Sequence, residues 1–346
     1  MLPVPPLRYL APRRLREALG LLEQGARGRT VPDGDGAQRR GPVLPIAGGT
    51  DLVPNLKHRL LDVELLVDLT RLEEPYLRGV REVEGRLHLG ALTSLADAAV
   101  DPLLRQRYPA LAGVYRKIGS PQLRNMGTVG GNLCLDTRCN YFNQSAFWRA
   151  ALGYCLKRKG TACHVVPGAT RCVASCSSDG AAFLTALGAE ARIEGVTGDR
   201  WVAVESLLQS EGRRHLAIEP WELVTELRLP AATPGRRAAY EKLRMRQAID
   251  FPLLSVAAVA DLEPGGACRS LRVVVSALGA RPRVVTGLGG LVEGRPLDDA
   301  ALERIAAEAH RQCHPLPNMT ADPAWRRAMV PVLVRRALRR AMGATE

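Results

Sequence analysis

Aromatic residues and long apolar runs are scarce in this sequence. Phe, Trp and Tyr together make up 4% of the 346 residues, so Leu, Val and Ala must build most of the core. No apolar segment approaches the roughly 20 residues that a helix needs to cross a bilayer. Residues 1–6 lack the basic start and the apolar stretch of a signal peptide. We therefore expect a folded cytoplasmic protein that is long enough for two or three domains.

Acidic residues are fewer than basic ones, which gives a formal net charge of +13 at pH 7. A nucleic-acid-binding protein would concentrate this charge in a stripe or in a recognisable module, and the sequence has neither. The best local clusters are the arginine pairs at 13–14, 39–40, 335–336 and 339–340, and we interpret them as solvated helix faces. A docking surface for an acidic protein such as a ferredoxin is the functional alternative. We expect neither nucleic acid nor a membrane as a partner.

Hydrophobic periodicity predicts two parts that differ in character. In the first part it indicates a helix over 12–23, strands over 43–47, 63–69 and 87–92, two helices between 95 and 118, and a helix over 179–187, with a polar Gly-rich linker at 25–41. The second part begins near Pro220 with four strands in succession, at 224–229, 238–246, 253–262 and 271–277. Helices at 298–312 and 321–340 follow. Strands first and helices after is the order of an α+β domain.

Two glycine-rich stretches lie in the first part. Ala47-Gly48-Gly49-Thr50-Asp51 directly follows a predicted strand. Because two of its positions lack a Cβ atom, the backbone can approach a phosphate and point amide groups at it. It is neither a Walker A loop nor a G-x-G-x-x-G turn, so alone it is better explained as an ordinary tight turn. The second stretch, Gly127-Thr128-Val129-Gly130-Gly131-Asn132, adds a hydroxyl and an amide side chain, and two such turns could grip a dinucleotide pyrophosphate.

Together these stretches make the sequence resemble the FAD-binding subunits of the xanthine dehydrogenase and carbon monoxide dehydrogenase family. The resemblance extends from the first helix to about residue 340 and covers nearly the whole chain. The matching segments are Pro45–Leu52, Ile118–Asn132, Ser178-Asp179, Tyr240-Glu241-Lys242, Asp250-Phe251-Pro252 and Ser276–Gly279.

The resemblance implies an α+β fold in two domains. A two-part FAD-binding domain of the vanillyl-alcohol-oxidase/PCMH type would occupy residues 1–220. A smaller α+β domain of the CO dehydrogenase flavoprotein type, with an antiparallel sheet and helices, would occupy 221–346.

The resemblance also implies roles for single residues. The first stretch would wrap the FAD pyrophosphate, and the second would form the wall along the other phosphate and the ribityl chain, with Ile118 beside it. Asp179 would accept a hydrogen bond from a ribityl or ribose hydroxyl, while Val224 and Lys242 would lie near the isoalloxazine ring. Without the resemblance, Asp179 would be a helix N-cap and Lys242 a surface lysine. The residues implied to bind FAD are Ile46, Ala47, Gly48, Gly49, Thr50, Asp51, Leu52, Val53, Ile118, Gly127, Thr128, Val129, Gly130, Gly131, Asn132, Asp179, Val224 and Lys242.

Six of the eight cysteines fall within 43 residues, from Cys134 to Cys176. In a cytosolic protein such a cluster favours a metal centre over disulfides. In the family, the second glycine stretch leads within a few residues to the segment before Asp179, whereas here an insertion over about 135–174 separates them. Cys134 and Cys176 lie next to the matched flavin segments and are assigned to the flavin-domain scaffold, with the substitution of either for a loop ligand left open. Four cysteines remain inside the insertion: Cys139, Cys155, Cys163 and Cys172.

Four thiolates suit a [4Fe–4S] cluster, one for each iron. The spacing C-x15-C-x7-C-x8-C lacks the C-x2-C pairs of bacterial ferredoxins and of most structural zinc sites. The residue chemistry therefore leaves an iron–sulfur cluster, a zinc ion and free structural cysteines open, and His164 is a further possible ligand.

The insertion itself, including Asp136-Thr137-Arg138-Cys139-Asn140-Tyr141-Phe142-Asn143-Gln144-Ser145, resembles the loop of 4-hydroxybenzoyl-CoA reductase β subunits. That loop has four cysteines and carries an extra [4Fe–4S] cluster. The resemblance thus implies Cys139, Cys155, Cys163 and Cys172 as the metal ligands, and FAD and the [4Fe–4S] cluster as the cofactors.

The implied function is electron transfer within a molybdenum-containing 4-hydroxybenzoyl-CoA reductase. This subunit would relay electrons between a ferredoxin-like carrier and a [2Fe–2S] small subunit. Substrate chemistry would take place on a molybdopterin-binding large subunit, in a heterohexamer with two copies of each of three subunits, and we expect no catalytic residue on this chain. The alternatives are a related molybdenum hydroxylase that oxidises an aromatic or N-heterocyclic substrate, a stand-alone FAD oxidase, and a zinc-stabilised binding protein.

Overall fold

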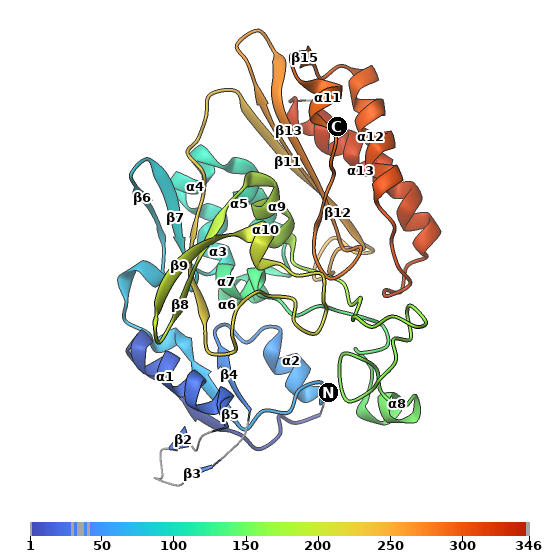
Figure 1. Cartoon of the computed structure of the whole chain (residues 1–346). Helices are drawn as coiled ribbons and strands as arrows, with labels where there is room; N and C mark the ends of the chain where they lie inside the picture. Colours follow the sequence, from blue (N-terminus) through green and yellow to red (C-terminus); the bar gives the residue numbers. More distant parts are fainter. Residues whose placement is uncertain (1, 29–30, 33–37, 40–41, 344–346) are drawn as a thin grey trace.

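The computed structural model of the chain describes residues 2–28, 31–32, 38–39 and 42–343 (Figure 1). Most of the linker predicted at 25–41, and Arg40 of the second arginine pair, lie outside these residues. The chain folds into three successive parts, each built around its own sheet, and a long loop segment that carries the clustered cysteines. None of the described helices is long and apolar enough to cross a membrane.

The first part is a three-stranded parallel sheet in the order β1-β5-β4. One face of the helix α1 covers it, because Leu15, Leu19 and Leu22 recur at helical spacing and are all buried. The elements of this part are β1 (Arg8–Leu10), α1 (Leu15–Ala26), β2 (Val31–Pro32), β3 (Gln38–Arg39), β4 (Val43–Ile46), α2 (Leu52–Lys57), β5 (Leu65–Asp68), η1 (Leu69–Arg71) and η2 (Pro75–Leu77).

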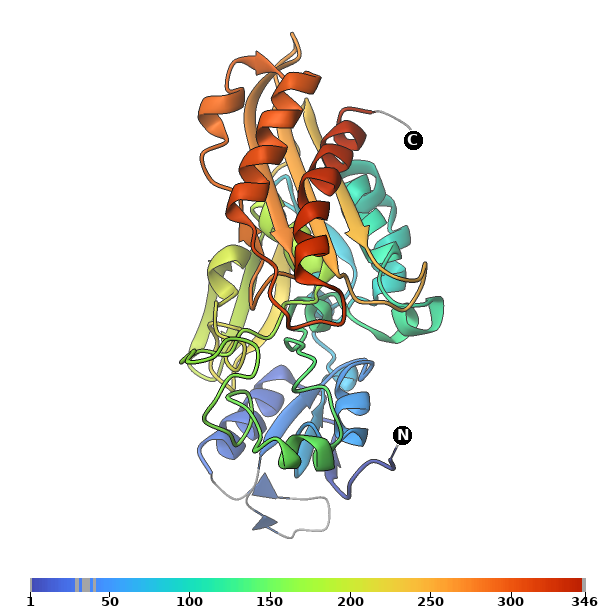
Figure 2. The same ribbon diagram turned by 90° about the vertical axis from the view of Figure 1, so that its right-hand side faces the viewer.

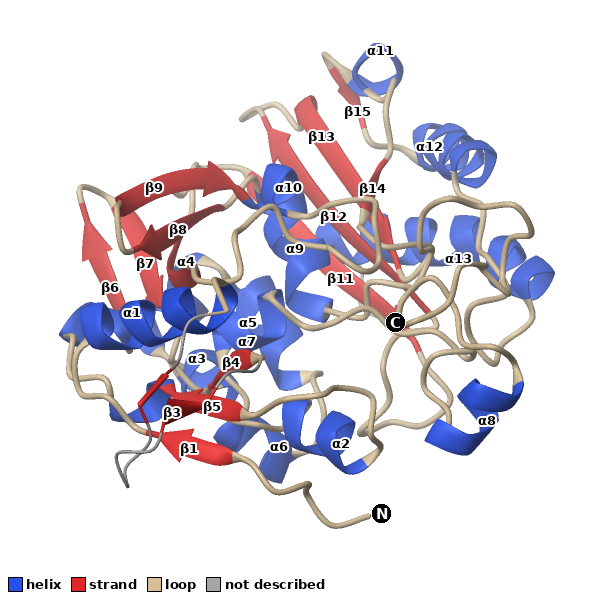
Figure 3. Ribbon diagram, turned by 60° about the horizontal axis from the view of Figure 1, so that its bottom comes forward, coloured by secondary structure: helices blue, strands red, loops and turns tan. Residues whose placement is uncertain are grey.

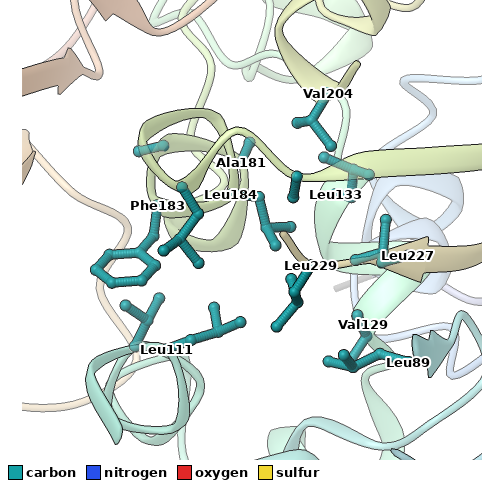
Figure 4. Packing of buried hydrophobic residues seen from close by; sticks show 14 of the residues in the cluster. Leu89, Leu111, Val129, Leu133, Ala181, Phe183, Leu184, Val204, Leu227 and Leu229 are labelled. Carbon is teal, nitrogen blue, oxygen red and sulfur yellow. The ribbon is translucent and has the colours of Figure 1, made fainter. Parts of the chain in front are cut away.

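The second part is a five-stranded antiparallel sheet in the order β6-β7-β10-β8-β9, packed against short helices. Its core lies between the sheet and the helices α5 and α9, where Leu111 and Phe183 face Leu227 and Leu229 (Figure 4). The elements are β6 (Val80–Val83), β7 (Arg86–Gly90), α3 (Leu95–Val100), α4 (Pro102–Arg107), α5 (Pro109–Arg116), α6 (Pro121–Met126), α7 (Val129–Leu133), α9 (Asp179–Leu187), β8 (Glu190–Gly195), β9 (Gly198–Ala203), α10 (Val204–Leu207) and β10 (Leu223–Arg228).

The third part is an antiparallel sheet in the order β11-β12-β13-β14, with two long helices along one face (Figure 2). Side chains of β12 alternate between two cores. Val256 and Ala258 face the helices α12 and α13, while Ala257 and Val259 face the core of the second part. The elements are β11 (Arg236–Leu243), β12 (Leu254–Leu262), β13 (Ala267–Ser276), β14 (Arg283–Val284), α11 (Gly289–Val292), β15 (Arg295–Pro296), α12 (Asp299–Gln312) and α13 (Pro323–Ala341).

The prediction that the strand at 224–229 opens the third sheet was wrong. This strand is β10, which lies at the centre of the second sheet and pairs with β7 and β8. Hydrophobic alternation identifies a strand but not its partners, and the polar hairpin β8-β9 that shares its sheet was not predicted at all. We therefore propose the boundary before the third part between β10 and β11, and not at residue 220.

The region predicted to hold two helices, residues 95–118, contains three. The predicted break at Asp101–Pro102 is present, and a second break falls before Pro109. Both prolines occupy the first turn of a helix, where the missing N–H removes no hydrogen bond.

The cysteine-rich segment runs between α7 and α9 and contains one short helix, α8 (Ala146–Ala151). Figure 3 shows this helix apart from the three sheets, at the end of an extended loop.

Candidate functional site

The first glycine turn joins the end of β4 to the start of α2. Gly49 has a φ of +67°, a conformation that residues with a Cβ adopt only with strain. The backbone N–H groups of Gly48, Gly49, Thr50 and Asp51 donate to no other described residue. Several amides in one tight turn with no protein acceptor form a concave donor surface that suits a phosphate.

The two glycine turns meet through their backbones. A Cβ placed on Gly48 would lie 1.7 Å from the carbonyl oxygen of Met126 and 3.0 Å from the nitrogen of Gly127. A Cβ on Gly127 would lie 3.4 Å from Oγ1 of Thr50. The structure thus brings together the two segments whose pairing the sequence predicted.

The second turn uses its amides differently from the first. Thr128 caps α7, and five of the six backbone N–H groups from Gly127 to Asn132 bond to carbonyl groups of α6, of the segment after β7 and of the turn itself, or to the Thr128 hydroxyl. The bonds are Gly127 N to Leu123 O (2.7 Å), Val129 N to Thr93 O (2.9 Å), Gly130 N to Ala91 O (2.8 Å), Gly131 N to Thr128 Oγ1 (3.0 Å) and Asn132 N to Thr128 O (2.8 Å). The turn therefore offers a rigid wall, and only the first turn offers a set of free donors.

Asn132 connects the second turn to α9. Its Oδ1 accepts hydrogen bonds from Ser178 Oγ and from Gly180 N, both at 3.1 Å. Ser178 in turn caps α9, because its Oγ accepts from Ala181 N at 3.0 Å. The helix cap is therefore Ser178, and the alternative interpretation of Asp179 as the N-cap was wrong.

Asp179 and Lys242 form a buried ion pair between α9 and β11. Their charged atoms are 2.8 Å apart, and their side chains are 3% and 2% exposed. The hydroxyl of Tyr240 also donates to Asp179. Burial, reinforced by the Asp179 carboxylate, raises the pKa of Tyr240 well above its ordinary value. Lys242 is therefore no surface lysine, and the roles implied for both charged residues toward FAD remain predictions.

Tyr240 lies in one of the segments that match the family, but it was not among the residues predicted to bind FAD. It stands two positions before Lys242 in β11, so both side chains point to the same face of the strand. That alternation was the available signal.

Val224 and Ile118, the other two residues predicted near the flavin, are half-buried against the core of the second part. Val224 lies on β10 of the second sheet, whereas Lys242 lies on β11 of the third. Ile118 follows α5, and its carbonyl accepts from Arg124 Nη1 at 2.9 Å.

The four cysteines of the insertion line one cavity. The cavity is narrow, and neither Cys134 nor Cys176 contributes to its walls. Within the described part of the chain, no three His, Cys, Asp or Glu side chains are grouped so as to hold a single metal ion. The thiols therefore surround a space and do not converge on a point. The cysteines on its walls are Cys139, Cys155, Cys163 and Cys172.

Backbone amides and one buried cation shape the electrostatics of this cavity. Burial raises the pKa of Cys139 to about 11, against hydrogen bonds from the backbone of Tyr141 and Phe142 that favour its thiolate. Burial also raises the pKa of Cys172, which the charge of Lys157 opposes. The Lys157 side chain is only 5% exposed. Its Nζ is paired with the Asp136 carboxylate at 2.8 Å, so the site provides N–H donors and a lysine already in an ion pair beside thiolates that a bound metal would deprotonate.

His164 also lines the cavity, but its Nε2 is 2.5 Å from the carbonyl oxygen of Tyr154. One of its two ring nitrogens is therefore already bonded inside the loop.

The cysteine loop touches all three parts of the chain. Arg158 donates to Leu60 O, next to α2. The hydroxyl of Thr137 donates to Gly212 O of the second part at 2.6 Å, and the backbone of Asn140 donates to Asn318 O of the third at 2.9 Å. The cavity is thus anchored from several directions although little regular structure surrounds it.

Comparison with known proteins matches two family models to this chain. Residues 5–232 match the FAD binding domain in molybdopterin dehydrogenase, and residues 238–341 match the CO dehydrogenase flavoprotein C-terminal domain. The carbon monoxide dehydrogenase medium chain of Afipia carboxidovorans is 30% identical over 86% of this chain and 88% of its own length. The nicotinate dehydrogenase FAD-subunit of Eubacterium barkeri is 26% identical over 87% of this chain and 84% of its own.

Solved structures show the same arrangement. Reconstituted CO dehydrogenase from Oligotropha carboxidovorans superposes over 100% of both chains, with a TM-score of 0.77 and 27% identity. The carbon monoxide dehydrogenase of Hydrogenophaga pseudoflava superposes over 99% of both chains, with a TM-score of 0.76 and 26% identity.

Proposed function

Since the chain belongs to the FAD-binding medium subunits of the molybdenum hydroxylase family, we propose that it is the FAD and [4Fe–4S] subunit of a 4-hydroxybenzoyl-CoA reductase-type enzyme. The observation that supports this assignment most is the cavity lined by four cysteines. A flavin subunit needs no such cavity to bind FAD. A [4Fe–4S] cluster, in contrast, needs a space surrounded by one thiolate for each iron.

The flavin side of the proposal is supported by the first glycine turn. Its unpaired amides suit the pyrophosphate, and Gly48 admits no side chain because its backbone lies against Met126. The buried pair Lys242–Asp179 would fix a charged edge beside the ring. Bound FAD would supply the exchange between two-electron and one-electron chemistry.

The cluster side is supported by the chemistry of the donor set. Four thiols surround a cavity, backbone N–H groups point at Cys139, and Lys157 places a buried positive charge nearby. A bound [4Fe–4S] cluster would supply a one-electron centre, whose potential depends on such hydrogen bonds and on burial. The residues of this chain would hold the cluster, exclude water from it and balance its charge.

The proposed assembly contains a molybdopterin-binding large subunit, a [2Fe–2S] small subunit and two copies of each chain, with a ferredoxin-like carrier as the external partner. Exposed apolar side chains near the glycine turns support a protein partner there. Met126, Met245 and Ile249 are 58%, 77% and 55% exposed. Ile249 N donates to Gly119 O, which brings its loop next to the segment that leads into the second turn.

A molybdenum hydroxylase that oxidises an aromatic or N-heterocyclic substrate is the second candidate. It is favoured by the similarity to the nicotinate dehydrogenase FAD-subunit. The two candidates differ in the organic substrate and in the direction of electron flow, and a zinc-stabilised binding protein differs from both in having no flavin.

Metal and flavin analysis of the purified complex tests the proposal. We expect FAD together with iron–sulfur absorbance, and a loss of about four iron atoms per chain in Cys155→Ser with FAD still bound. The control Cys134→Ala, outside the cavity, should keep its iron. Reduction of 4-hydroxybenzoyl-CoA with a low-potential donor would identify the reductase, whereas zinc without flavin, or an unchanged iron content in Cys155→Ser, would refute the proposal.

A further inference from the structure

Arg138 stands at the neck of the cysteine loop, one residue before Cys139. Its backbone pairs with Ser175 at the far end of the insertion, with Arg138 N to Ser175 O at 2.9 Å and Ser175 N to Arg138 O at 2.6 Å. The two hydrogen bonds close the loop at its base. Because Cys139 follows directly, the position of its thiol depends on the backbone of Arg138.

The side chain of Arg138 leaves the loop and reaches the first glycine turn. Its guanidinium forms an ion pair with Asp51, and both side chains are 23% exposed. Asp51 is the last residue of the turn with unpaired amides and immediately precedes α2. It also accepts from Asn55 Nδ2 at 3.0 Å, so its carboxylate is fixed from two sides.

The same guanidinium lies over the ring of Phe251, 4.0 Å from the ring centre. Phe251 belongs to the loop between β11 and β12. One side chain therefore joins the cysteine loop, the first glycine turn and the third part of the chain. The buried Nε of this guanidinium has no hydrogen-bond partner among the described residues.

This arrangement links two sites that the sequence treats as separate. A ligand in the cysteine cavity fixes Cys139 and hence the backbone of Arg138. A ligand in the first turn fixes Asp51. Each ligand orders one end of the same ion pair, and a site ordered in advance binds its ligand with a smaller loss of conformational freedom.

On the basis of the proposed function, we propose that Arg138 is a positioning residue that couples the two cofactor sites. When the cysteine cavity is filled, Arg138 holds the first glycine turn in its flavin-binding form. Thermodynamic linkage makes the coupling reciprocal: filling the cavity strengthens FAD binding by the same factor by which FAD strengthens retention of the cluster.

The test is a double-mutant cycle on the whole complex, with FAD affinity measured by flavin fluorescence after removal and titration of FAD. We expect Cys155→Ser, which empties the cavity, to weaken FAD binding roughly tenfold. We expect Arg138→Gln to weaken it about as much while iron is retained, and the double variant to be little worse than either single one. Arg138→Lys, which keeps the charge but loses the planar contact with Phe251, should fall between wild type and Arg138→Gln.

Arg158→Gln is the matched control. Arg158 belongs to the same loop and binds Leu60 O and Asp62, outside the glycine turn, so an Arg158→Gln complex that retains its iron should have wild-type FAD affinity. An iron-loaded Arg138→Gln complex with wild-type FAD affinity, or additive effects in the double variant, would overturn the coupling alone. A wild-type complex without the loop's iron would overturn the proposed function, and the coupling with it.

Discussion

The two glycine-rich turns have similar compositions and opposite uses. In the first, the amides of Gly48 to Asp51 donate to no other described residue. In the second, five amides from Gly127 to Asn132 bond to carbonyl and hydroxyl groups of the protein. The glycines also serve different contacts. The missing side chain of Gly48 lets the two turns touch, whereas that of Gly130 lets α7 pack against Ala91. Glycine content alone therefore does not identify a phosphate-binding turn, and the surroundings of its amides do.

Of the substitutions that test the difference between the two turns, Gly48→Ala should have the largest effect on stability and FAD binding. The new Cβ would overlap Met126 O, and backbone groups cannot rotate away as a side chain does. We expect the turns to separate, with a stability loss of about 3 kcal/mol and loss of FAD from the purified chain. FAD content and chemical denaturation measure both.

Gly49→Ala provides a milder version of the same test if Gly48→Ala does not fold. Gly49 has a positive φ, and its new Cβ would meet only the side chains of Val53 and Ile46. Gly20→Ala is the control, because Gly20 lies in α1 with open space around it. It should gain up to about 1 kcal/mol of stability and keep its FAD. Full FAD binding in both turn variants would contradict a flavin role for the first turn.

Gly130→Ala should have the second largest effect, on stability and not on the cofactor. Its Cβ would lie 2.6 Å from Ala91 Cβ, in the buried contact between α7 and the end of β7. We expect a loss of about 2 kcal/mol in denaturant unfolding, with near-normal FAD affinity in the folded protein. A loss of FAD affinity as large as in Gly49→Ala would show that the two turns do not differ as described.

The smallest expected effects are those of two threonine substitutions, one in each glycine turn. Thr128→Ala removes the cap of α7 and should cost about 1 kcal/mol of stability while lowering FAD affinity less than Thr50→Ala does. Thr50→Ala, in the turn with free amides, should weaken FAD binding and leave the unfolding midpoint nearly unchanged. Isothermal titration and thermal unfolding of both variants provide the measurement, and the reverse pattern would contradict the assignment of the turns.

The sequence predicted local features of the molecule more successfully than distant contacts. The helix expected at 179–187 begins and ends at those residues, because its apolar run is bounded by Ser178 and Gly188. The four insertion cysteines lie around one cavity, whereas their expected role as metal ligands stays a prediction. The sequence does not distinguish the free amides of the first turn from the hydrogen-bonded amides of the second, because the acceptor carbonyl groups of Ala91 and Thr93 are distant from the second turn in the sequence.

The other features that the sequence did not predict also depend on contacts between residues distant in the sequence. The central place of β10 depends on β7 and β8, which a pattern of alternation does not specify. The contact between Arg138 and Asp51 joins residues from two motifs that look independent in the sequence. The boundaries of elements follow from neighbouring residues, whereas the partners of a polar group follow from the tertiary fold.

The anchoring of the cysteine loop sets an order of events during synthesis. All four cysteines leave the ribosome before Gly212 and Asn318, the residues that receive the hydrogen bonds of Thr137 and Asn140. β7 must likewise wait for β10 before its sheet is complete. Chains emerge from their N-terminal end, so the contacts that anchor the loop are complete only when nearly the whole polypeptide is present. In the proposed function, metal loading of this loop would therefore be a late, post-translational step, and a chain released early would leave these thiols without the contacts that anchor their loop.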